Sequence, residues 1–169
     1  MRGGASLEPG SVGYTRNGTR TLIDQRSVGG IGEVACGPTS CAMIMTDQGM
    51  AVSIVDLAKQ AGINGEGTTV DGLANAMRKN GVPSARWRSD LSIDDLATAT
   101  AQGQPAIVQM ELAKSRHFVI VDGITTRPQL AVGDLVAVRD PWGGTQYFVP
   151  VDEFKQRMMG WGVLTNSQR

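Results

Sequence analysis

The spacing of apolar residues changes its period after residue 103. Before this point apolar side chains recur at helical intervals, in segments that open near Ser, Thr or Pro and close at Gly. These segments predict four helices, over residues 37–49, 53–62, 68–81 and 92–103. Cys36 lies at the start of the first of them.

After residue 103 the apolar residues occur in short runs, rich in Val, Ile and aromatic residues and separated by turn residues. The runs predict strands over residues 105–112, 117–124, 134–141, 145–151 and 160–165, with a short helix over residues 151–159. Helices followed by strands are typical of an α+β domain. We therefore predict an α+β fold in which N-terminal helices pack on a C-terminal antiparallel sheet.

Composition indicates one globular domain without affinity for nucleic acid or membrane surfaces. The length of 169 residues suits one domain, with residues 1–20 as a flexible Gly-rich arm and residues 21–169 as the domain. The 16 basic and 16 acidic residues cancel, whereas nucleic-acid and membrane-surface proteins carry a basic excess. The sequence has no signal-peptide pattern and no apolar stretch long enough for a bilayer. We expect a cytoplasmic protein, or one delivered as part of a secreted effector.

The two cysteines, Cys36 and Cys41, are five residues apart on the first predicted helix. Helix geometry separates their Cα atoms by roughly 8 Å on different faces, beyond the limit of about 7 Å for a disulfide. The chain has a single histidine and no Cys-x-x-Cys pair, so the sequence predicts no metal site and no cofactor. Cys41, among apolar neighbours, is expected in the core.

Cys36 has the surroundings of a nucleophile. The first N–H groups of a helix lack intrahelical acceptors and the helix dipole favours negative charge there. A thiolate is the reactive form of cysteine, and a helix N-terminus or an adjacent imidazolium stabilises it. Gly37 is expected to leave space for a substrate backbone, and Pro38 to set the helical φ.

The single histidine, His117, opens an apolar strand, and Asp140 ends another, directly before a Pro-Trp-Gly-Gly turn. Asp before Pro commonly starts a turn, and this structural role is compatible with a catalytic one. A base that activates a thiol, held in orientation by a carboxylate, is the general arrangement of nucleophilic triads. The sequence therefore predicts a triad of Cys36, His117 and Asp140.

Three blocks, "ACGPTSCAMI", "RHFVIVDGI" and "VAVRDPWGG", resemble those of papain-like cysteine peptidases, and more closely those of the bacteriocin-processing, double-glycine-leader peptidases. The resemblance runs from about Gln25 to Trp161. It implies the papain-like fold and cleavage of a protein or peptide substrate through a thioacyl-enzyme. It also implies Cys36 as the nucleophile, His117 as the base and Asp140 as its orienting group.

The sequence departs from this family upstream of the nucleophile. Family members usually place a glutamine, which donates to the oxyanion, about six residues before the cysteine, where this chain has Gly30. The nearest upstream glutamine is Gln25, eleven residues before Cys36. We expect the Gly-rich segment between them to loop out and Gln25 to donate, while a solvated loop position for Gln25 stays open. The residues 125–134 are expected to form a long loop near the substrate cleft.

Other functions remain compatible with these residues. Papain-like domains with such blocks also occur as toxin modules of bacterial secreted effectors, and an immunity or inhibitor protein would then be a partner. The same three residues would serve a glutamine deamidase or transglutaminase. A non-catalytic peptide-binding module is a further alternative, although such members usually lose part of the triad.

Overall fold

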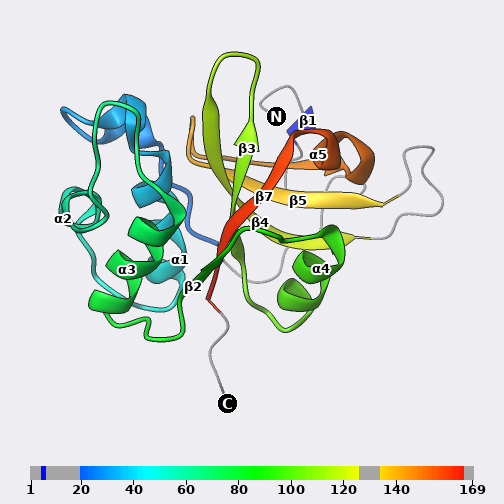
Figure 1. Ribbon diagram of the computed structural model, residues 1–169, viewed down its shortest axis with the longest axis horizontal. Helices are drawn as coiled ribbons and strands as arrows, with labels where there is room; N and C mark the ends of the chain where they lie inside the picture. The colour runs from blue at the N-terminus through cyan, green and yellow to red at the C-terminus, as the bar shows by residue number, and fades with distance from the viewer. Residues whose placement is uncertain (1–4, 7–19, 126–133, 166–169) are drawn as a thin grey trace.

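The computed structural model describes residues 5–6, 20–125 and 134–165 (Figure 1). Most of the predicted arm, residues 1–20, and of the predicted loop, residues 125–134, lies outside these residues. Both therefore stay predictions.

Three helices of the first half of the chain lie side by side: α1 (Cys36–Asp47), α2 (Ile54–Gln60) and α3 (Val70–Lys79). Pro38 occupies the first turn of α1, where its missing N–H costs no hydrogen bond. The side chains of Ser53 and Thr69 cap the starts of α2 and α3 by accepting backbone N–H bonds. Local sequence therefore sets where these helices begin, as predicted.

The strands form one antiparallel sheet in the order β1-β6-β5-β4-β3-β7-β2. Their bounds are β1 (Ala5–Ser6), β2 (Arg86–Arg88), β3 (Ala106–Glu111), β4 (Arg116–Thr125), β5 (Leu135–Asp140), β6 (Thr145–Pro150) and β7 (Met158–Leu164). Each neighbouring pair is antiparallel. The predicted α+β fold, with N-terminal helices packed on a C-terminal antiparallel sheet, is confirmed.

The sheet is buried on both faces, which explains the nearly continuous apolar runs of its central strands. Ile107 and Ile120 belong to the core that the sheet shares with α1–α3. Their neighbours Val108 and Val119 belong to a second core. Two further helices, α4 (Ile93–Ala101) and α5 (Val151–Arg157), cover that second face, away from α1–α3 (Figure 1).

Strand β2 is absent from the sequence prediction. It has only three residues, two of them Arg, so it carries no apolar run that marks a strand. It pairs with β7, with Arg86 opposite Leu164, and forms the edge of the sheet next to β7. Strand β7 also begins at Met158, two residues before the predicted start, because α5 ends at Arg157. Within the described residues, none of the helices has the length and apolarity needed to cross a membrane.

Candidate active site

Cys36 is the first residue of α1 and lines a cleft of about 1270 Å³ between the helical layer and the sheet. Its thiol is partly exposed. The N–H groups of the first turn of α1 point out of the helix start, because they have no acceptor one turn earlier. A negative charge on the Cys36 sulfur therefore lies at the positive end of the helix dipole.

Gly37 has a different role from the one expected. It is buried, and a Cβ atom there would collide with the side chains of Thr68 and Leu73. The missing side chain therefore lets the start of α1 pack against α3 and the loop before it, rather than making room for a substrate. The effect on Cys36 is indirect, since this packing fixes where the helix begins.

The imidazole of His117 and the carboxylate of Asp140 form a buried pair. His117 lies at the start of β4 and Asp140 at the end of β5, two antiparallel neighbours with Ile120 opposite Arg139. This register places the two side chains on the same face, diagonally across the strands. His117 Nε2 is 2.7 Å from Asp140 Oδ1, and the side chains are 9% and 0% exposed.

The Asp140 carboxylate both stabilises the turn that follows it and contacts the imidazole of His117. The backbone N–H of Trp142 donates to Asp140 Oδ1 over 2.9 Å, as in an Asx-turn. The hydroxyl of Tyr147 donates to Asp140 Oδ2 over 2.7 Å. Burial alone would raise the pKa of Asp140, but the contacts with His117, Tyr147 and Trp142 outweigh it and lower that pKa. Asp140 is therefore held as a carboxylate.

His117 is held in its charged form despite burial. Burial by itself lowers the pKa of an imidazole. The hydrogen bonds and charges of Asp140 and of the Cys36 thiolate act in the opposite direction and raise the pKa of His117 to about 9. Because Asp140 occupies Nε2, the nitrogen that remains for Cys36 is Nδ1. Of the three residues predicted from sequence, Cys36 and His117 line the cleft, and Asp140 contacts His117 from a fully buried position.

Gln25 lines the same cleft as Cys36 and His117. It is 1% exposed, so the alternative of a solvated loop position is wrong. Its Nε2 donates to Gly32 O over 2.8 Å, and a primary amide carries a second N–H. The residues between Gln25 and Cys36 fold into two short 3₁₀ turns, η1 (Gln25–Ser27) and η2 (Gly32–Val34), which take up the extra length.

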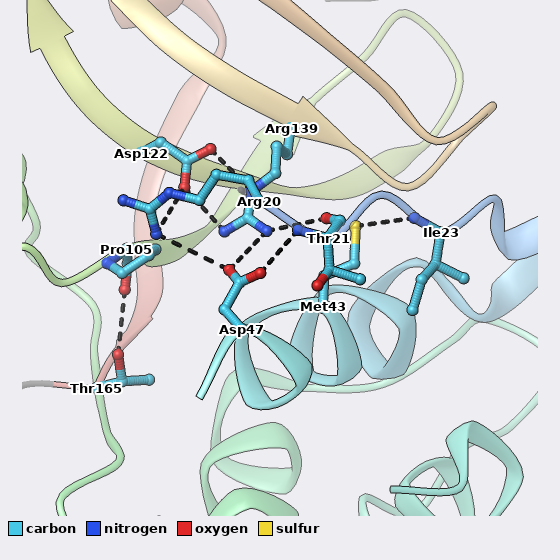
Figure 2. A network of polar contacts seen from close by, with 9 residues as sticks. All are labelled: Arg20, Thr21, Ile23, Met43, Asp47, Pro105, Asp122, Arg139 and Thr165. Atoms are coloured by element: carbon cyan, nitrogen blue, oxygen red, sulfur yellow. Dashed lines mark hydrogen bonds and ion pairs between the residues drawn. The ribbon is translucent and has the colours of Figure 1, made fainter. Parts of the chain in front are cut away.

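Gln25 belongs to a segment that we call the N-terminal strap, residues 20–26. Thr21 donates its N–H to Asp47 Oδ1 at the end of α1 over 2.7 Å, and Ile23 N–H lies 3.3 Å from the sulfur of Met43 (Figure 2). Arg139 Nη1 donates to Thr21 O over 3.0 Å. The strap is therefore fixed both to the helix that carries Cys36 and to β5, which carries Asp140.

Arg139 is the centre of a buried charge network. Its guanidinium makes two hydrogen bonds to Asp122 on β4, of 2.8 and 2.9 Å, and an ion pair with Asp47 at 2.9 Å (Figure 2). Arg20 lies within 4.0 Å of both carboxylates. Burial raises the pKa of Asp122, against the effect of Arg139. Helix, strap and sheet are thus joined through one fully buried guanidinium.

The strap also rests on the turn that follows Asp140. The N–H of Gln25 donates to Pro141 O over 2.7 Å, and Asp24 Oδ1 accepts from Gly143 N–H over 3.1 Å. Gly144 has a positive φ of 61°, and a Cβ there would press on the strap backbone. These contacts tie the position of Gln25 to the position of the Asp140 carboxylate.

The two walls of the cleft carry different charged residues. The helical wall carries Glu33, Glu66 and Asp71, and the sheet wall carries Lys114 and Arg116 together with Trp161. The Trp161 ring stacks on Trp87 at 5.7 Å, and both side chains are exposed. A cleft of this volume has room for several residues of a peptide.

The second cysteine has no such surroundings. Cys41 is fully buried, and burial raises the pKa of its thiol to about 12. Both cysteines are free thiols. In the part of the chain that the structure describes, no cluster of three or more His, Cys, Asp or Glu residues is arranged to hold a metal ion.

Tyr147 and the strap are the parts of this site that the sequence did not reveal. Tyr147 lies within a correctly predicted strand, but a strand pattern does not say which strand pairs with it or in which register. The strap has no periodic pattern of its own. Its contacts are made by backbone groups and by residues far away in the sequence.

Comparisons with known proteins agree with this geometry. Residues 29–168 match the model of the peptidase C39 family. Among solved structures, the chain is similar to the peptidase domain of Streptococcus ComA, a bifunctional ABC transporter of a quorum-sensing pathway. Identity is 20%, the TM-score is 0.67, and the match covers 86% of this chain and 96% of that one.

Two more solved structures are similar. A C39-like peptidase from Bacillus anthracis has 17% identity and a TM-score of 0.68, over 88% of this chain and 94% of that one. A double glycine motif protease from an AMS/PCAT transporter, solved with a leader peptide, has 17% identity and a TM-score of 0.61. That match covers 86% of this chain and 89% of that one. No curated protein matches the chain.

Proposed function

Since the chain belongs to the peptidase C39 family and is a cysteine peptidase, we propose that it cleaves peptide bonds with a triad of Cys36, His117 and Asp140. The observation that carries the proposal is the 2.7 Å contact between His117 and Asp140 beside a cysteine that opens a helix. Gln25 completes the site as an oxyanion donor.

The first half of the reaction forms a thioester. The Cys36 thiolate attacks the carbonyl carbon of the peptide bond, and the carbonyl oxygen becomes an oxyanion. The backbone N–H of Cys36 and the free N–H of Gln25 donate to this oxygen. His117 gives its Nδ1 proton to the nitrogen of the breaking bond, and the amine product leaves.

The second half regenerates the thiolate. Neutral His117 takes a proton from a water molecule, whose oxygen attacks the thioester carbon. The C–S bond breaks, the acid product leaves, and Cys36 and His117 return to the thiolate–imidazolium pair. Asp140 remains a carboxylate throughout and fixes the ring so that Nδ1 faces the sulfur.

The size of the cleft supports the proposed substrate class. A cleft of about 1270 Å³ exceeds the roughly 300–1,000 Å³ of typical small-molecule sites and has room for a peptide segment. The similar double glycine motif protease was solved with a leader peptide. We therefore propose a peptide, or an exposed segment of a protein, as the substrate of this chain.

Site-resolved alkylation is the direct test of the pair. Wild-type protein and His117→Ala are treated with iodoacetamide between pH 4 and 9, and each cysteine is followed by mass spectrometry. Cys36 should react quickly at acidic pH in the wild type and slowly in His117→Ala, while native Cys41 should not react. Equal, slow labelling of Cys36 in both proteins would contradict a thiolate–imidazolium pair.

A peptide library tests the reaction itself. Peptides with and without a double glycine are incubated with wild type and with Cys36→Ala, and products are identified by mass spectrometry. Cleavage that Cys36→Ala lacks is the expected result. Ammonia release from glutamine without backbone cleavage would instead identify a deamidase on the same residues.

A further inference from the structure

We propose that Tyr147 is a positioning residue of the peptidase reaction, which acts by holding the outer oxygen of the Asp140 carboxylate. This inference rests on the proposed function, because it assumes that Asp140 orients His117. The triad of the resemblance ends at Asp140. The structure adds a fourth member, on the next strand of the sheet.

Strand pairing places His117, Asp140 and Tyr147 next to one another. Tyr147 on β6 is directly opposite Val138 on β5, so it lies diagonally across from Asp140, two residues further along β5. His117 on β4 lies diagonally across from Asp140 on the other side, since Ile120 is opposite Arg139. Three adjacent strands therefore present imidazole, carboxylate and phenol side by side on one face.

The hydrogen bonds of Asp140 divide between its two oxygens. Oδ1 lies 2.7 Å from Nε2 of His117 and accepts a hydrogen bond from the N–H of Trp142 over 2.9 Å. Oδ2 accepts a hydrogen bond from the Tyr147 hydroxyl over 2.7 Å. Rotation of the carboxylate about its Cβ–Cγ bond would break all three contacts together. The hydrogen bond from Tyr147 therefore fixes the orientation of the carboxylate plane, and with it the contact between Oδ1 and the imidazole of His117.

Burial makes the phenol important. Asp140 is 0% exposed and Tyr147 is 4% exposed, so water does not reach Oδ2 to replace a lost hydroxyl. A buried carboxylate that loses one of its donors binds a proton more readily. Protonated Asp140 no longer stabilises an imidazolium. Without the phenol, the thiolate–imidazolium pair should therefore form only at higher pH.

Tyr147→Phe removes the hydroxyl and keeps the ring. We expect kcat to fall roughly ten- to a hundredfold, because misorientation of a reacting group is costly, with KM changed by less than about twofold. The acid limb of the kcat/KM profile should move up by about half a pH unit or more. The acid limb of Cys36 alkylation should move in the same direction, and this readout needs no peptide substrate.

Thr165→Val is the matched control. Thr165 is also buried, and its hydroxyl donates to Pro105 O over 3.2 Å (Figure 2). None of the described hydrogen bonds of Asp140 involves Thr165 or Pro105. Both variants lose one buried hydroxyl bond and should lower the melting temperature by similar amounts. Only Tyr147→Phe should move the two acid limbs. A stability loss in Tyr147→Phe with unmoved acid limbs would overturn the proposal.

Wild-type protein offers an independent measurement if Tyr147→Phe folds poorly. A phenolic proton bonded to a buried carboxylate should exchange slowly with solvent and give its own NMR signal. That signal should shift as Asp140 gains a proton at low pH, and its insensitivity to acid would contradict the proposed bond. Failure of the proposed function is distinct, since peptides would stay uncut while both alkylation and this signal still respond to acid.

Discussion

His117 Nε2 lies 2.7 Å from Asp140 Oδ1; both side chains are buried, and His117 lines the cleft together with Cys36. The contact fixes the orientation of the ring and leaves Nδ1 for the thiol. It also sets the charge of the ring, since the contacts of His117 with Asp140 and Cys36 overcome the cost of burial. The following predictions test this relationship and the structure that supports it.

His117 should titrate far above an ordinary histidine. It is the single histidine of the chain, so its ring C–H signals in an NMR titration are unambiguous. We expect a pKa of about 9 in the wild type. Asp140→Asn and Cys36→Ala should each lower this pKa, because each removes a partner that favours the imidazolium. A wild-type midpoint near 6.5 would show that the ring is not paired.

The same shift predicts how stability depends on pH. A raised pKa in the folded state means that the stabilisation is complete below about pH 6.5 and is lost as pH rises through about 9. The shift corresponds to about 3 kcal/mol at 1.36 kcal/mol per pKa unit. Urea unfolding should therefore show that His117→Ala is much less stable than wild type at pH 6 and closer to it at pH 9.5. A deficit that does not change with pH would contradict the charged pair.

Asp140→Asn should leave a folded enzyme with little activity. The amide cannot stabilise an imidazolium, and it permits the wrong ring tautomer. We expect kcat to fall by on the order of a hundredfold or more, as measured on a cleaved peptide. Asp94→Asn, at an exposed carboxylate in the first turn of α4, is the control and should keep full activity. Comparable activity in both variants would remove Asp140 from the reaction.

Gln25→Ala should slow the chemistry and leave the thiol unaffected. Removal of one oxyanion donor lowers kcat by about 10² to 10³. The rate of Cys36 alkylation should stay within about twofold of wild type, because alkylation forms no oxyanion. Gln102→Ala, at the exposed end of α4, is the control. Equal peptide cleavage by Gln25→Ala and Gln102→Ala would show that Gln25 is only a structural residue.

Arg139→Met should destabilise the fold in a pH-dependent way. It leaves the carboxylates of Asp122 and Asp47 without their buried cation, and breaking a buried pair typically costs about 3–5 kcal/mol. Asp122 keeps only the weaker contact with Arg20, at 3.9 Å, so its pKa rises further and protonation at low pH relieves part of the loss. Urea unfolding at pH 4.5 should thus show a smaller deficit than at pH 7.

Arg88→Met is the matched control for that loss. Arg88 pairs with Asp90 and Asp95 at the surface, where solvent screens ion pairs and they contribute little to stability. Its deficit should be small at both pH values. If Arg139→Met behaves in the same way, the buried network does not stabilise the junction of helix, strap and sheet.

The sequence was sufficient for what depends on local signals. Ser92 and Asp95 predict a capped helix and form a reciprocal capping box in the structure. The resemblance to bacteriocin-processing peptidases is confirmed by the family match. Cys36, His117 and Asp140 lie at the ends of predicted elements; Cys36 and His117 line the cleft, and Asp140 contacts His117.

The sequence was insufficient for what depends on pairing between distant segments. Strand β2 has no apolar run and exists because β7 offers it an edge. Tyr147 meets Asp140 because of the register of β6 on β5. The position of Gln25 depends on the hydrogen bond from its backbone N–H to Pro141 O, a contact between distant segments that no local pattern predicts.

The strap, residues 20–26, lies outside the segment that matches the family model. The family match starts at residue 29, four positions after Gln25. A shortened chain that started there would keep Cys36, His117 and Asp140, and its thiol would still react with small alkylating agents. It would lack Gln25, the proposed side-chain donor to the oxyanion, and the Thr21 carbonyl that Arg139 binds. If Gln25 donates as proposed, the family match and full activity have different N-terminal limits in this protein, and a thiol probe alone would not detect the difference.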